Sequence, residues 1–505
     1  MKCIITVYTI ILVLSLTGCS RNNARDEGPY YTGSVSFPAD TGMEEKIKMA
    51  ASVIPDSQQI AWQKLEMTAF IHFSVNTFTG KEWGDGDESP ELFNPTEFNA
   101  EQWARVISEA GMKMIILTCK HHDGFCLWPT RTTKHSVRYS PWRSGGGDVV
   151  REVKEACDKY GLKFGIYLSP WDRNAESYGS EAYNEFYMAQ LKELLTWYGT
   201  VDEVWFDGAN GEAADGKVQE YDWDTYYRLI DRYQPDAVTA VMGEDIRWVG
   251  TESGYGRETE WSVTALAPGA GEKSNKINEK LGLNAMSEDL GSADLVKKAN
   301  KLFWYPAEVD VSIRPGWFYH SEEDDRVKSP EKLFDIYINS VGRNAVLLLN
   351  IPPDRRGLIH ETDVKHLNEF KAYLDRTFEK NIAFRAFTRY PGARKSVDGK
   401  EDTYTHIDEL PAEIEYKFPF AEDFNVFMIK EFISKGQRIE EFKVEAFTDG
   451  EWHEIAGSTT VGYNKLLKFP VTTSDRIRLT ILKSRYNAMI SEIGLYLEPD
   501  SSELE

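Results

Sequence analysis

Residues 99–118 read NAEQWARVISEAGMKMIILT and join a helix to a strand. In the first half, apolar side chains recur at positions i, i+3, i+4 and i+7, which predicts a helix with one buried face. Asn99 before this helix and Gly111 after it are typical start and stop signals. The largely apolar run Met112–Thr118, interrupted by Lys113, predicts a buried strand. A helix followed at once by a buried strand is typical of a parallel α/β sheet.

The same unit recurs along the chain. Asp148 to Tyr160 predicts a second helix that Gly161 ends, and Ser329-Pro330 opens a third. Eight buried strands are predicted, at Met67–Ser74, Met112–Thr118, Leu162–Ser169, Val201–Gly208, Ala237–Met242, Glu258–Val263, Val309–Ile313 and Ala345–Ile351. This alternation predicts a (β/α)8-like barrel over residues 56–385, with its chemistry at the carboxyl ends of the strands. An open doubly wound sheet is the alternative, but no glycine-rich phosphate loop follows the first strand.

The helical period ends near residue 386. Apolar residues then alternate from Phe442 to Ala446, up to the turn signal Asp449-Gly450, and again from Ile477 to Ile481. The pattern predicts an antiparallel β-sandwich over residues 386–505.

The amino terminus has the composition of an export signal. Lys2 precedes an apolar run, Ile4–Leu16, that is too short to span a membrane and ends in Leu16-Thr17-Gly18-Cys19. We expect residues 1–18 to be a lipoprotein signal peptide, Cys19 to carry a lipid anchor, and residues 19–55 to form a tether. The protein would then lie in the periplasm or on the outer-membrane surface, its only membrane contact being the lipid. An ordinary signal peptide with a chance cysteine is the alternative.

Net charge, cysteine count and aromatic content limit the classes of function that the sequence allows. The formal charge of −23, from 58 basic and 81 acidic residues, repels a phosphate backbone and argues against nucleic acid as a partner. Cys119, Cys126 and Cys157 are an odd number in the body of the chain, so disulfides do not organise the fold. Cys119-Lys120-His121-His122 has no second ligand pair, so we expect neither a metal nor a cofactor. Aromatic residues, at 13%, supply faces that pack and also stack on sugar rings.

Polar residues gather where the predicted strands end. They are His72, His121, His122, Tyr167, Asp207 and Glu252. An Asp and a Glu at one barrel mouth meet the needs of glycoside cleavage, in which one carboxylate attacks or stabilises the anomeric carbon and one acid protonates the leaving oxygen. Each of these residues alone is weak evidence for a catalytic site, because an Asp at a strand end is often a helix cap and paired His residues are often structural.

At these residues the chain resembles the α-L-fucosidases of glycoside hydrolase family 29 over nearly its whole mature length. The shared motifs are FIHF at 70–73, EWGDG at 82–86, KHHDGF at 120–125, LWP at 127–129, YLSPW at 167–171 and VWFDG at 204–208. RWVGTESGY at 247–255, RETEWS at 257–262 and RPGW at 314–317 resemble the branch that favours α-1,3 and α-1,4 bonds. The β-rich tail is similar to the discoidin-like, galactose-binding domain often appended in that branch.

The resemblance implies a retaining enzyme that removes terminal L-fucose from a fucosylated oligosaccharide or glycoconjugate, with Asp207 as nucleophile and Glu252 as acid/base. It also implies a fucose pocket made by His72, Glu82, Trp83, His121, His122, Tyr167 and Trp205. We add Trp317 to this set, and Trp317 and Trp83 are the two candidates for an apolar face beside the fucose methyl group. Thr251 departs from the pattern, where Asn is expected before the acid.

Other functions remain compatible with the sequence. They are an α-fucosidase of broader linkage, an α-L-galactosidase, and an inactive glycan-binding lipoprotein. In the C-terminal domain, Trp452 and Tyr463 are candidates to touch a glycan, although a domain that only shields the barrel explains them equally well.

Overall fold

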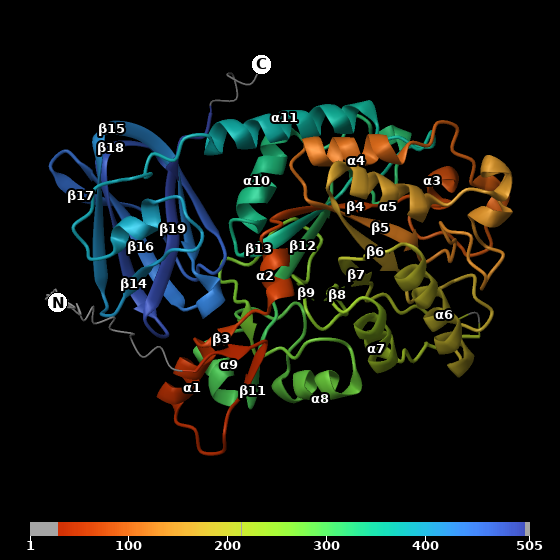
Figure 1. Ribbon diagram of the computed structural model, residues 1–505, viewed down its shortest axis with the longest axis horizontal. Coiled ribbons are helices and arrows are strands. Elements are labelled where there is room, and N and C mark those ends of the chain that lie inside the picture. The colour runs from red at the N-terminus through yellow and green to blue at the C-terminus, as the bar shows by residue number, and fades with distance from the viewer. Residues whose placement is uncertain (1–28, 214, 500–505) are drawn as a thin grey trace, which may run out of the picture.

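The structure is a computed structural model that describes residues 29–213 and 215–499 (Figure 1). Its central sheet holds eight parallel strands: β4 (Met67–Ile71), β5 (Met114–Lys120), β6 (Lys163–Leu168), β7 (Glu203–Phe206), β8 (Val238–Val241), β9 (Arg247–Trp248), β12 (Ala307–Ser312) and β13 (Ala345–Asn350). Their order is β8-β7-β6-β5-β4-β13-β12-β9, and one parallel bridge, Ala240 to Ile246, links the two edges. The sheet is a nearly closed barrel, which confirms the predicted fold.

Helices surround the barrel. They include α2 (Ser57–Gln63), α4 (Ala100–Glu109), α5 (Val149–Tyr160), α6 (Glu181–Trp197), α7 (Trp223–Tyr233), α10 (Pro330–Ser340) and α11 (Glu361–Phe378), with the single turn α3 (Asn76–Thr79) after β4. The predicted caps are confirmed: the Asn99, Asp148 and Ser329 side chains each accept a backbone N–H from the first turn of their helix. Gly161 ends α5 at φ 69°, a conformation that favours glycine.

The prediction of the sixth strand at Glu258–Val263 is wrong. The barrel strand in this position is β9, eleven residues earlier in the chain. Its Arg247 is 1% exposed because the guanidinium pairs with Glu260 and donates to the Tyr305 carbonyl. A charged residue in a buried strand interrupts the apolar run by which such a strand is recognised in a sequence. Val263–Thr264 forms β10 instead, in a separate antiparallel sheet of order β10-β11-β2.

The prediction of a tether is wrong for residues 29–55, which are folded. They form β1 (Tyr31–Thr32), β2 (Ser34–Ser36), α1 (Met43–Ala50) and β3 (Val53–Ile54). β2 pairs with β11 (Lys301–Trp304), and α1 buries Met49 beside Trp304. The polar segment gives no local signal of this order because the strand that pairs with β2 lies 265 to 269 residues further along the chain. The predicted signal peptide and Cys19 lie outside the described residues.

The C-terminal part is an antiparallel β domain, as predicted, and lies beside the barrel (Figure 1). Its strands are β14 (Thr405–Ile407), β15 (Ala412–Glu431), β16 (Ile439–Thr448), β17 (Glu451–Ser458), β18 (Lys465–Ser484) and β19 (Ala488–Tyr496), in the order β14-β19-β15-β18-β16-β17. The turn at Asp449-Gly450 joins β16 to β17, with φ of 53° and 86°. The domain has its own hydrophobic core, which begins at Ala383.

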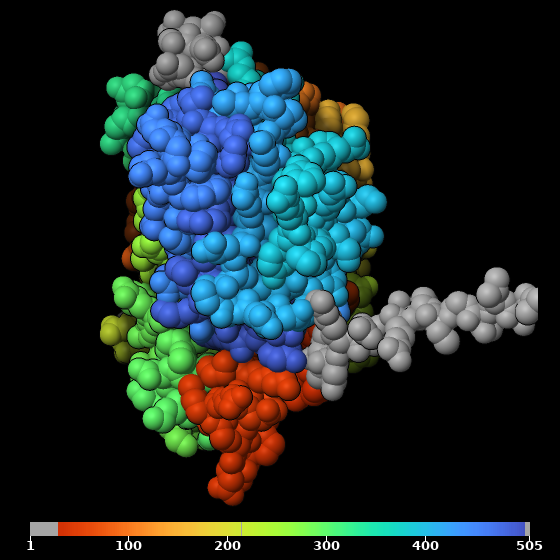
Figure 2. Space-filling view, turned by 90° about the vertical axis from the view of Figure 1, so that its left-hand side faces the viewer, coloured from red at the N-terminus to blue at the C-terminus, as the bar shows by residue number. Residues whose placement is uncertain are grey.

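The β domain covers one end of the molecule and presents a broad surface there (Figure 2). Tyr463 does not point to solvent: its hydroxyl donates to Glu66 of the barrel, and Lys430 pairs with the same carboxylate at 3.2 Å. Tyr463 therefore ties the two domains together. No helix in the described ranges has the length and apolar character needed to cross a membrane.

Candidate active site

The predicted site residues converge at the carboxyl ends of the barrel strands. His72 follows β4, His121 and His122 follow β5, and Asp207 follows β7, while Tyr167 lies near the end of β6. The rings are in contact, with centroid distances of 5.4 Å for His72 to His121 and 5.8 Å for His121 to Tyr167. These five side chains form one site, as expected from strand order.

Asp207 is fixed by two donors. The Tyr167 hydroxyl donates to Oδ2 at 2.9 Å, and the Ala209 backbone N–H donates to Oδ1 at 2.7 Å. His122 Nε2 lies 3.8 Å from Oδ2, too far for a direct hydrogen bond. The side chain is 24% exposed, so a ligand can reach a carboxylate that is already oriented.

Hydrogen bonds set the proton position on His122. Ser169 Oγ donates to the Trp171 carbonyl at 2.7 Å, so it accepts from Nδ1–H of His122 at 2.8 Å. Burial lowers the pKa of His122, against the opposing charge of Asp207. The neutral ring therefore carries its proton on Nδ1 and presents the Nε2 lone pair beside Asp207, where a sugar hydroxyl can donate to it.

His72 is oriented by the same logic. Asn350 Nδ2 donates to the Trp317 carbonyl at 2.8 Å and to Ser312 Oγ at 2.9 Å, which turns its Oδ1 toward His72. His72 Nδ1–H donates to that oxygen at 2.8 Å, and burial lowers the pKa of His72 to about 3. Its Nε2 is thus a permanent acceptor across the neutral pH range.

His121 completes a group of three imidazoles. It is 5% exposed, and its Nδ1 has no hydrogen-bond partner in the described part of the chain. The ring lies nearly parallel to Tyr167, at 16°, and edge-on to Phe318 at 5.1 Å. Burial lowers its pKa well below the usual value, so it too is neutral at pH 7.

Glu82 and Trp317 meet above the histidines. Glu82 Oε2 accepts the Trp317 backbone N–H at 2.8 Å, and its Oε1 lies 2.6 Å from His320 Nε2. The Trp317 ring lies 5.1 Å from the His72 ring. Glu82 therefore holds the loop after β12 in place, so that the indole of Trp317 forms one wall of the site.

The other two predicted aromatic residues occupy different levels. Trp83 is 58% exposed on the rim, with its ring 6.1 Å from His122 and 5.8 Å from Trp171. Trp205 is buried below, stacked on Tyr167 at 5.3 Å and 28°. Trp83 is available to a ligand, whereas Trp205 forms the floor.

Glu252 lies on an exposed turn at the rim, in the loop after β9. Trp317 Nε1 donates to its Oε2 at 3.4 Å. Partial burial raises the pKa of Glu252, the Trp317 hydrogen bond opposes the rise, and the charge of Asp207 adds to it. The site thus pairs a carboxylate fixed by donors with a carboxyl group that retains its proton more strongly than usual, which are the two states that glycoside cleavage needs.

A sequence profile of the α-L-fucosidase family matches residues 48–379, which is more than half of the chain. The chain belongs to the α-L-fucosidase family. The fucosidase is 42% identical to alpha-L-fucosidase 1 of Arabidopsis thaliana over 88% of each chain. A crystal structure described as a putative alpha-L-fucosidase from Bacteroides ovatus is 54% identical, with a TM-score of 0.88 over 94% of this chain and 79% of that one.

A third relative has been solved with a sugar. This glycoside hydrolase family 29 fucosidase from Ruminococcus gnavus, in complex with fucose, is 32% identical, with a TM-score of 0.77 over 90% of this chain and 96% of that one. Together the comparisons make the protein a glycoside hydrolase of family 29.

Asp310 is a carboxyl group that sequence reasoning missed in the fucosidase. It lies on β12, is 4% exposed, and accepts the Trp248 indole N–H at 2.8 Å. Burial raises the pKa of Asp310 to about 7, and the charges of Glu252 and Asp207 act in the same direction. Asp310 alternates with apolar residues in AEVDVS, residues 307–312, and all six residues of this strand are buried, so the sequence pattern alone does not distinguish its inward face from a solvent-exposed one.

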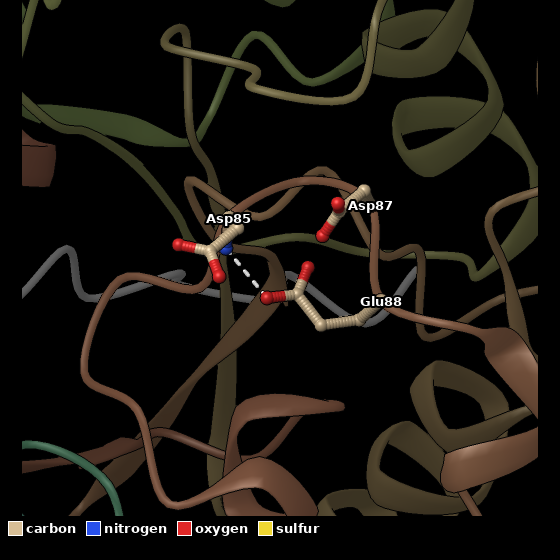
Figure 3. A group of neighbouring side chains, drawn as sticks. All are labelled: Asp85, Asp87 and Glu88. Carbon is tan, nitrogen blue, oxygen red and sulfur yellow. Dashed lines mark hydrogen bonds between the residues drawn. The ribbon is translucent and has the colours of Figure 1, made fainter.

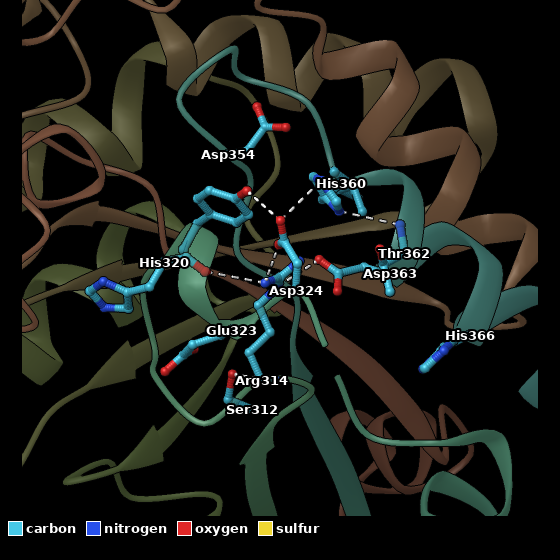
Figure 4. Close-up of polar contacts among 12 residues, drawn as sticks. Ser312, Arg314, His320, Glu323, Asp324, Asp354, His360, Thr362, Asp363 and His366 are labelled. Atoms are coloured by element: carbon cyan, nitrogen blue, oxygen red, sulfur yellow. Dashed lines mark hydrogen bonds and ion pairs between the residues drawn. The ribbon is translucent and has the colours of Figure 1, made fainter. Parts of the chain in front are cut away.

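His320 was also missed, because no motif marks it. It belongs to the loop after β12, which a buried ion-pair network fixes in the fucosidase (Figure 4). Arg314 Nε donates to Asp363 at 2.9 Å, and Nη1 donates to Asp324 at 2.9 Å. Asp363 lies in the first turn of α11, so this helix anchors the loop that carries Trp317 and His320.

An acidic group follows Trp83. Asp85, Asp87 and Glu88 are, within the described ranges, the group whose oxygens lie close enough together to hold a cation (Figure 3). Glu88 already accepts the backbone N–H groups of Asp85 and Gly86, and Lys81 pairs with Asp85. The cluster closes the turn that carries Glu82 and Trp83, and this role accounts for its geometry.

Proposed function

We propose that the fucosidase is a retaining exo-α-L-fucosidase in which Asp207 is the nucleophile and Glu252 is the general acid and then the general base. The observation that carries this proposal is the contrast between the two carboxyl groups. Two donors fix the orientation of the Asp207 carboxylate at the barrel mouth. Glu252 stands beside Trp317 with a raised pKa.

The reaction then has two steps. Asp207 attacks the anomeric carbon while the glycosidic C–O bond breaks, and Glu252 gives its proton to the leaving oxygen. The resulting glycosyl ester removes the charge of Asp207, so the pKa of Glu252 falls and its carboxylate accepts a proton from water. That water attacks the anomeric carbon, and Asp207 leaves as a carboxylate. Two inversions give retention.

The pocket fits a small neutral sugar with several hydroxyl groups. His72 and His122 each offer an Nε2 acceptor, fixed by Asn350 and Ser169 respectively. The Trp317 ring offers an apolar face for a methyl group beside them. Paired acceptors next to an apolar wall suit L-fucose, which carries three hydroxyls and one methyl on its ring.

The stereochemistry of the first product tests this mechanism. Proton NMR of an aryl α-L-fucoside during the first minutes of hydrolysis should show α-L-fucose before mutarotation. A retaining enzyme also requires the Asp207 and Glu252 carboxyl groups to lie about 5 to 5.5 Å apart. Release of β-L-fucose as the first product rejects the covalent mechanism but leaves a fucosidase.

Two alternatives make different predictions. L-galactose differs from L-fucose by a hydroxyl on C6, so an α-L-galactosidase would cleave the aryl α-L-galactoside at least as fast as the fucoside. A glycan-binding protein without turnover would bind fucosylated oligosaccharides and release no sugar. We expect the fucoside to be preferred, because Trp317 gives the C6 position an apolar neighbour and leaves a hydroxyl there without a partner.

We further propose that the natural bonds are α-1,3 and α-1,4 branches from N-acetylglucosamine. The segment from residue 243 to 302 is folded, with α8 (Glu272–Leu281), α9 (Ala293–Lys298) and its own apolar contacts. Arg257 donates to the Ala285 carbonyl, and a side chain at Gly250 would meet Ala285 at 2.7 Å, so this segment packs on the loop that carries Glu252. A wall beside the acid is where a leaving sugar sits.

Met286 is an exposed apolar residue of this wall, at 69% exposure. The test compares kcat/KM for a Lewis trisaccharide and for 2'-fucosyllactose. We expect the trisaccharide to be preferred and Met286→Ala to reduce that preference while leaving an aryl fucoside unaffected, because the aryl group is too small to reach the wall. Equal kcat/KM for both oligosaccharides contradicts the linkage proposal.

We also propose that the protein is exported and lipid-anchored through Cys19, in the periplasm or on the outer-membrane surface. The support is the apolar run Ile4–Leu16 followed by Leu16-Thr17-Gly18-Cys19. Cys19→Ala should move the protein from the membrane fraction to the soluble fraction. Unchanged fractionation contradicts the anchor.

A further inference from the structure

Two glutamates lie inside the barrel, below the active site. Glu203 is the first residue of β7, and Glu308 is the second residue of β12. They are 0% and 1% exposed, among apolar residues of the barrel interior such as Phe70 and Leu348. Carboxyl groups in such surroundings are costly and call for a physical explanation.

Each carboxyl group has one indole partner. Trp62 Nε1 of α2 donates to Glu203 Oε2 at 2.8 Å, and Trp205 Nε1 donates to Glu308 Oε2 at 2.7 Å. The other oxygen of each group, Oε1, has no hydrogen-bond partner among the described residues. No Lys, Arg or His of that part of the chain forms an ion pair with either glutamate. The two groups therefore lack the cation that would stabilise a buried charge.

Like charges make ionisation harder still. Burial raises the pKa of Glu203 to about 8, and Asp202 and Asp245 act in the same direction. Burial raises the pKa of Glu308 well above its usual value, helped by Glu203 and Asp310. Glu308 is therefore a neutral carboxylic acid at pH 7, whose Oε2 can accept one strong hydrogen bond without the cost of a buried charge.

The hydrogen bond between Glu308 and Trp205 is the first of a series of contacts that reaches Asp207. Trp205, held by Glu308, stacks on Tyr167 at 5.3 Å and 28°. Tyr167 donates to Asp207 Oδ2 at 2.9 Å. Glu308 touches neither the sugar pocket nor Asp207, but a shift of the Trp205 ring displaces the Tyr167 ring that orients the carboxylate.

We propose that Glu308 is a positioning residue for the fucosidase reaction: its hydrogen bond inside the barrel fixes the indole of Trp205 and, through Tyr167, the carboxylate of Asp207. The proposal rests on the assignment of Asp207 as nucleophile. Glu203, a neighbour of Glu308, makes the equivalent bond to Trp62 of α2, which has no ring contact with Tyr167 among the described residues, and Glu203 serves as the comparison variant.

The test compares Glu308→Gln, Glu308→Leu and Glu203→Leu, each with kcat and KM on an aryl α-L-fucoside and with circular dichroism to measure the folded fraction. Glu308→Gln keeps a neutral acceptor for the indole, so we expect kcat within about 3-fold of wild type. Glu308→Leu leaves the Trp205 N–H unpaired, so we expect kcat to fall about 10- to 100-fold with KM changed less than about 3-fold. Glu203→Leu should destabilise the fold comparably, with kcat within about 3-fold of wild type.

A double variant separates positioning from general damage. If Glu308 acts through Trp205, Glu308→Leu combined with Trp205→Phe should be no slower than Trp205→Phe alone. Full activity of folded Glu308→Leu, an equal loss in Glu308→Gln, or an equal loss in Glu203→Leu overturns the proposal. Failure of the wild-type protein to hydrolyse the fucoside rejects the proposed function instead. The positioning role rests on that function and falls with it.

Discussion

The role of Glu252 leads to the sharpest prediction, because its two possible functions have different signatures. It either donates a proton to the leaving sugar or only holds Trp317 through the 3.4 Å hydrogen bond to Oε2. A contact of that length is weak, so its loss accounts for less than about tenfold in rate. Loss of general acid catalysis costs about 10²- to 10⁴-fold when the leaving group is a poor one.

The experiment uses Glu252→Gln and Glu252→Ala with two substrates. On a fucosylated oligosaccharide, we expect both variants to lose about 10²- to 10⁴-fold in kcat/KM, because neither side chain carries a proton to donate. On a 4-nitrophenyl fucoside the loss should be far smaller, because the aryloxide leaves without protonation. Azide should take the place of the base-activated water in the second step and yield α-L-fucosyl azide, because two inversions retain the configuration.

The pH profile provides an independent check on Glu252. An acid must be protonated to act, so activity is present below its pKa and is lost as pH rises through it. Burial and the charge of Asp207 raise that pKa, which moves the alkaline limb of kcat/KM upward from the usual range of a glutamate. Both variants should lack this limb. Equal losses on both substrates, or recovery of oligosaccharide hydrolysis in Glu252→Gln, would refute the acid assignment and favour the Trp317-holding role.

Three further predictions concern stability. Asp310 keeps its proton up to about pH 7 when folded but only to about 3.8 when unfolded, so it costs stability increasingly as pH rises between these values. Asp310→Asn should therefore raise the free energy of unfolding, measured by urea denaturation, by up to about 4 kcal/mol at pH 8 and by little at pH 4. An equal gain at both pH values contradicts the raised pKa of Asp310. Arg314→Leu should cost about 3 to 5 kcal/mol in the same assay, against about 0 to 1 kcal/mol for Arg356→Leu, whose ion pairs are partly exposed; similar losses would deny the special role of the buried network. Gly436→Ala should lower the Tm by several degrees, because its Cβ would meet the Ala51 carbonyl oxygen at 2.3 Å and because residue 436 has a φ of 98°. An unchanged Tm would show that the contact between residues 436 and 51 adjusts without loss of stability.

Local signals were sufficient for most of the barrel. The helix that starts after Asn99 and the buried strand that ends near Lys120 each form from residues that are adjacent in sequence. The hydrophobic pattern therefore predicts them without knowledge of tertiary contacts. The same is true of the strand ends: once parallel strands are recognised, His72, Tyr167 and Asp207 must share one edge. Their convergence follows from topology.

The errors arose where long-range partners decide the structure. The buried Arg247 of strand β9 forms an ion pair with Glu260, which offsets the cost of its charge inside the protein. The residues after Gly28 are ordered because β2 pairs with β11, far along the chain. A window of ten residues contains neither partner, so the local pattern placed the sixth strand at Glu258–Val263 and predicted a tether at the amino terminus.

The missed site residues have a similar cause. Asp310 and Glu308 alternate with apolar residues in a six-residue strand, a pattern that usually marks a face exposed to solvent. In a barrel of eight strands the inward face is packed, so the acids depend on Trp248 and Trp205, residues from other strands. His320 becomes recognisable only through its contact with Glu82.

The covalent intermediate on Asp207 is the central claim, and trapping it is the most direct measurement. Incubation with 2-deoxy-2-fluoro-α-L-fucosyl fluoride slows both steps, and proteolysis with mass spectrometry then locates the label. We expect one fluorofucosyl group per active site, on Asp207 within the sequence VWFDG of residues 204–208. A label on Glu252, Asp310 or any other residue, or the absence of a label from an enzyme whose first product is β-L-fucose, would contradict the mechanism.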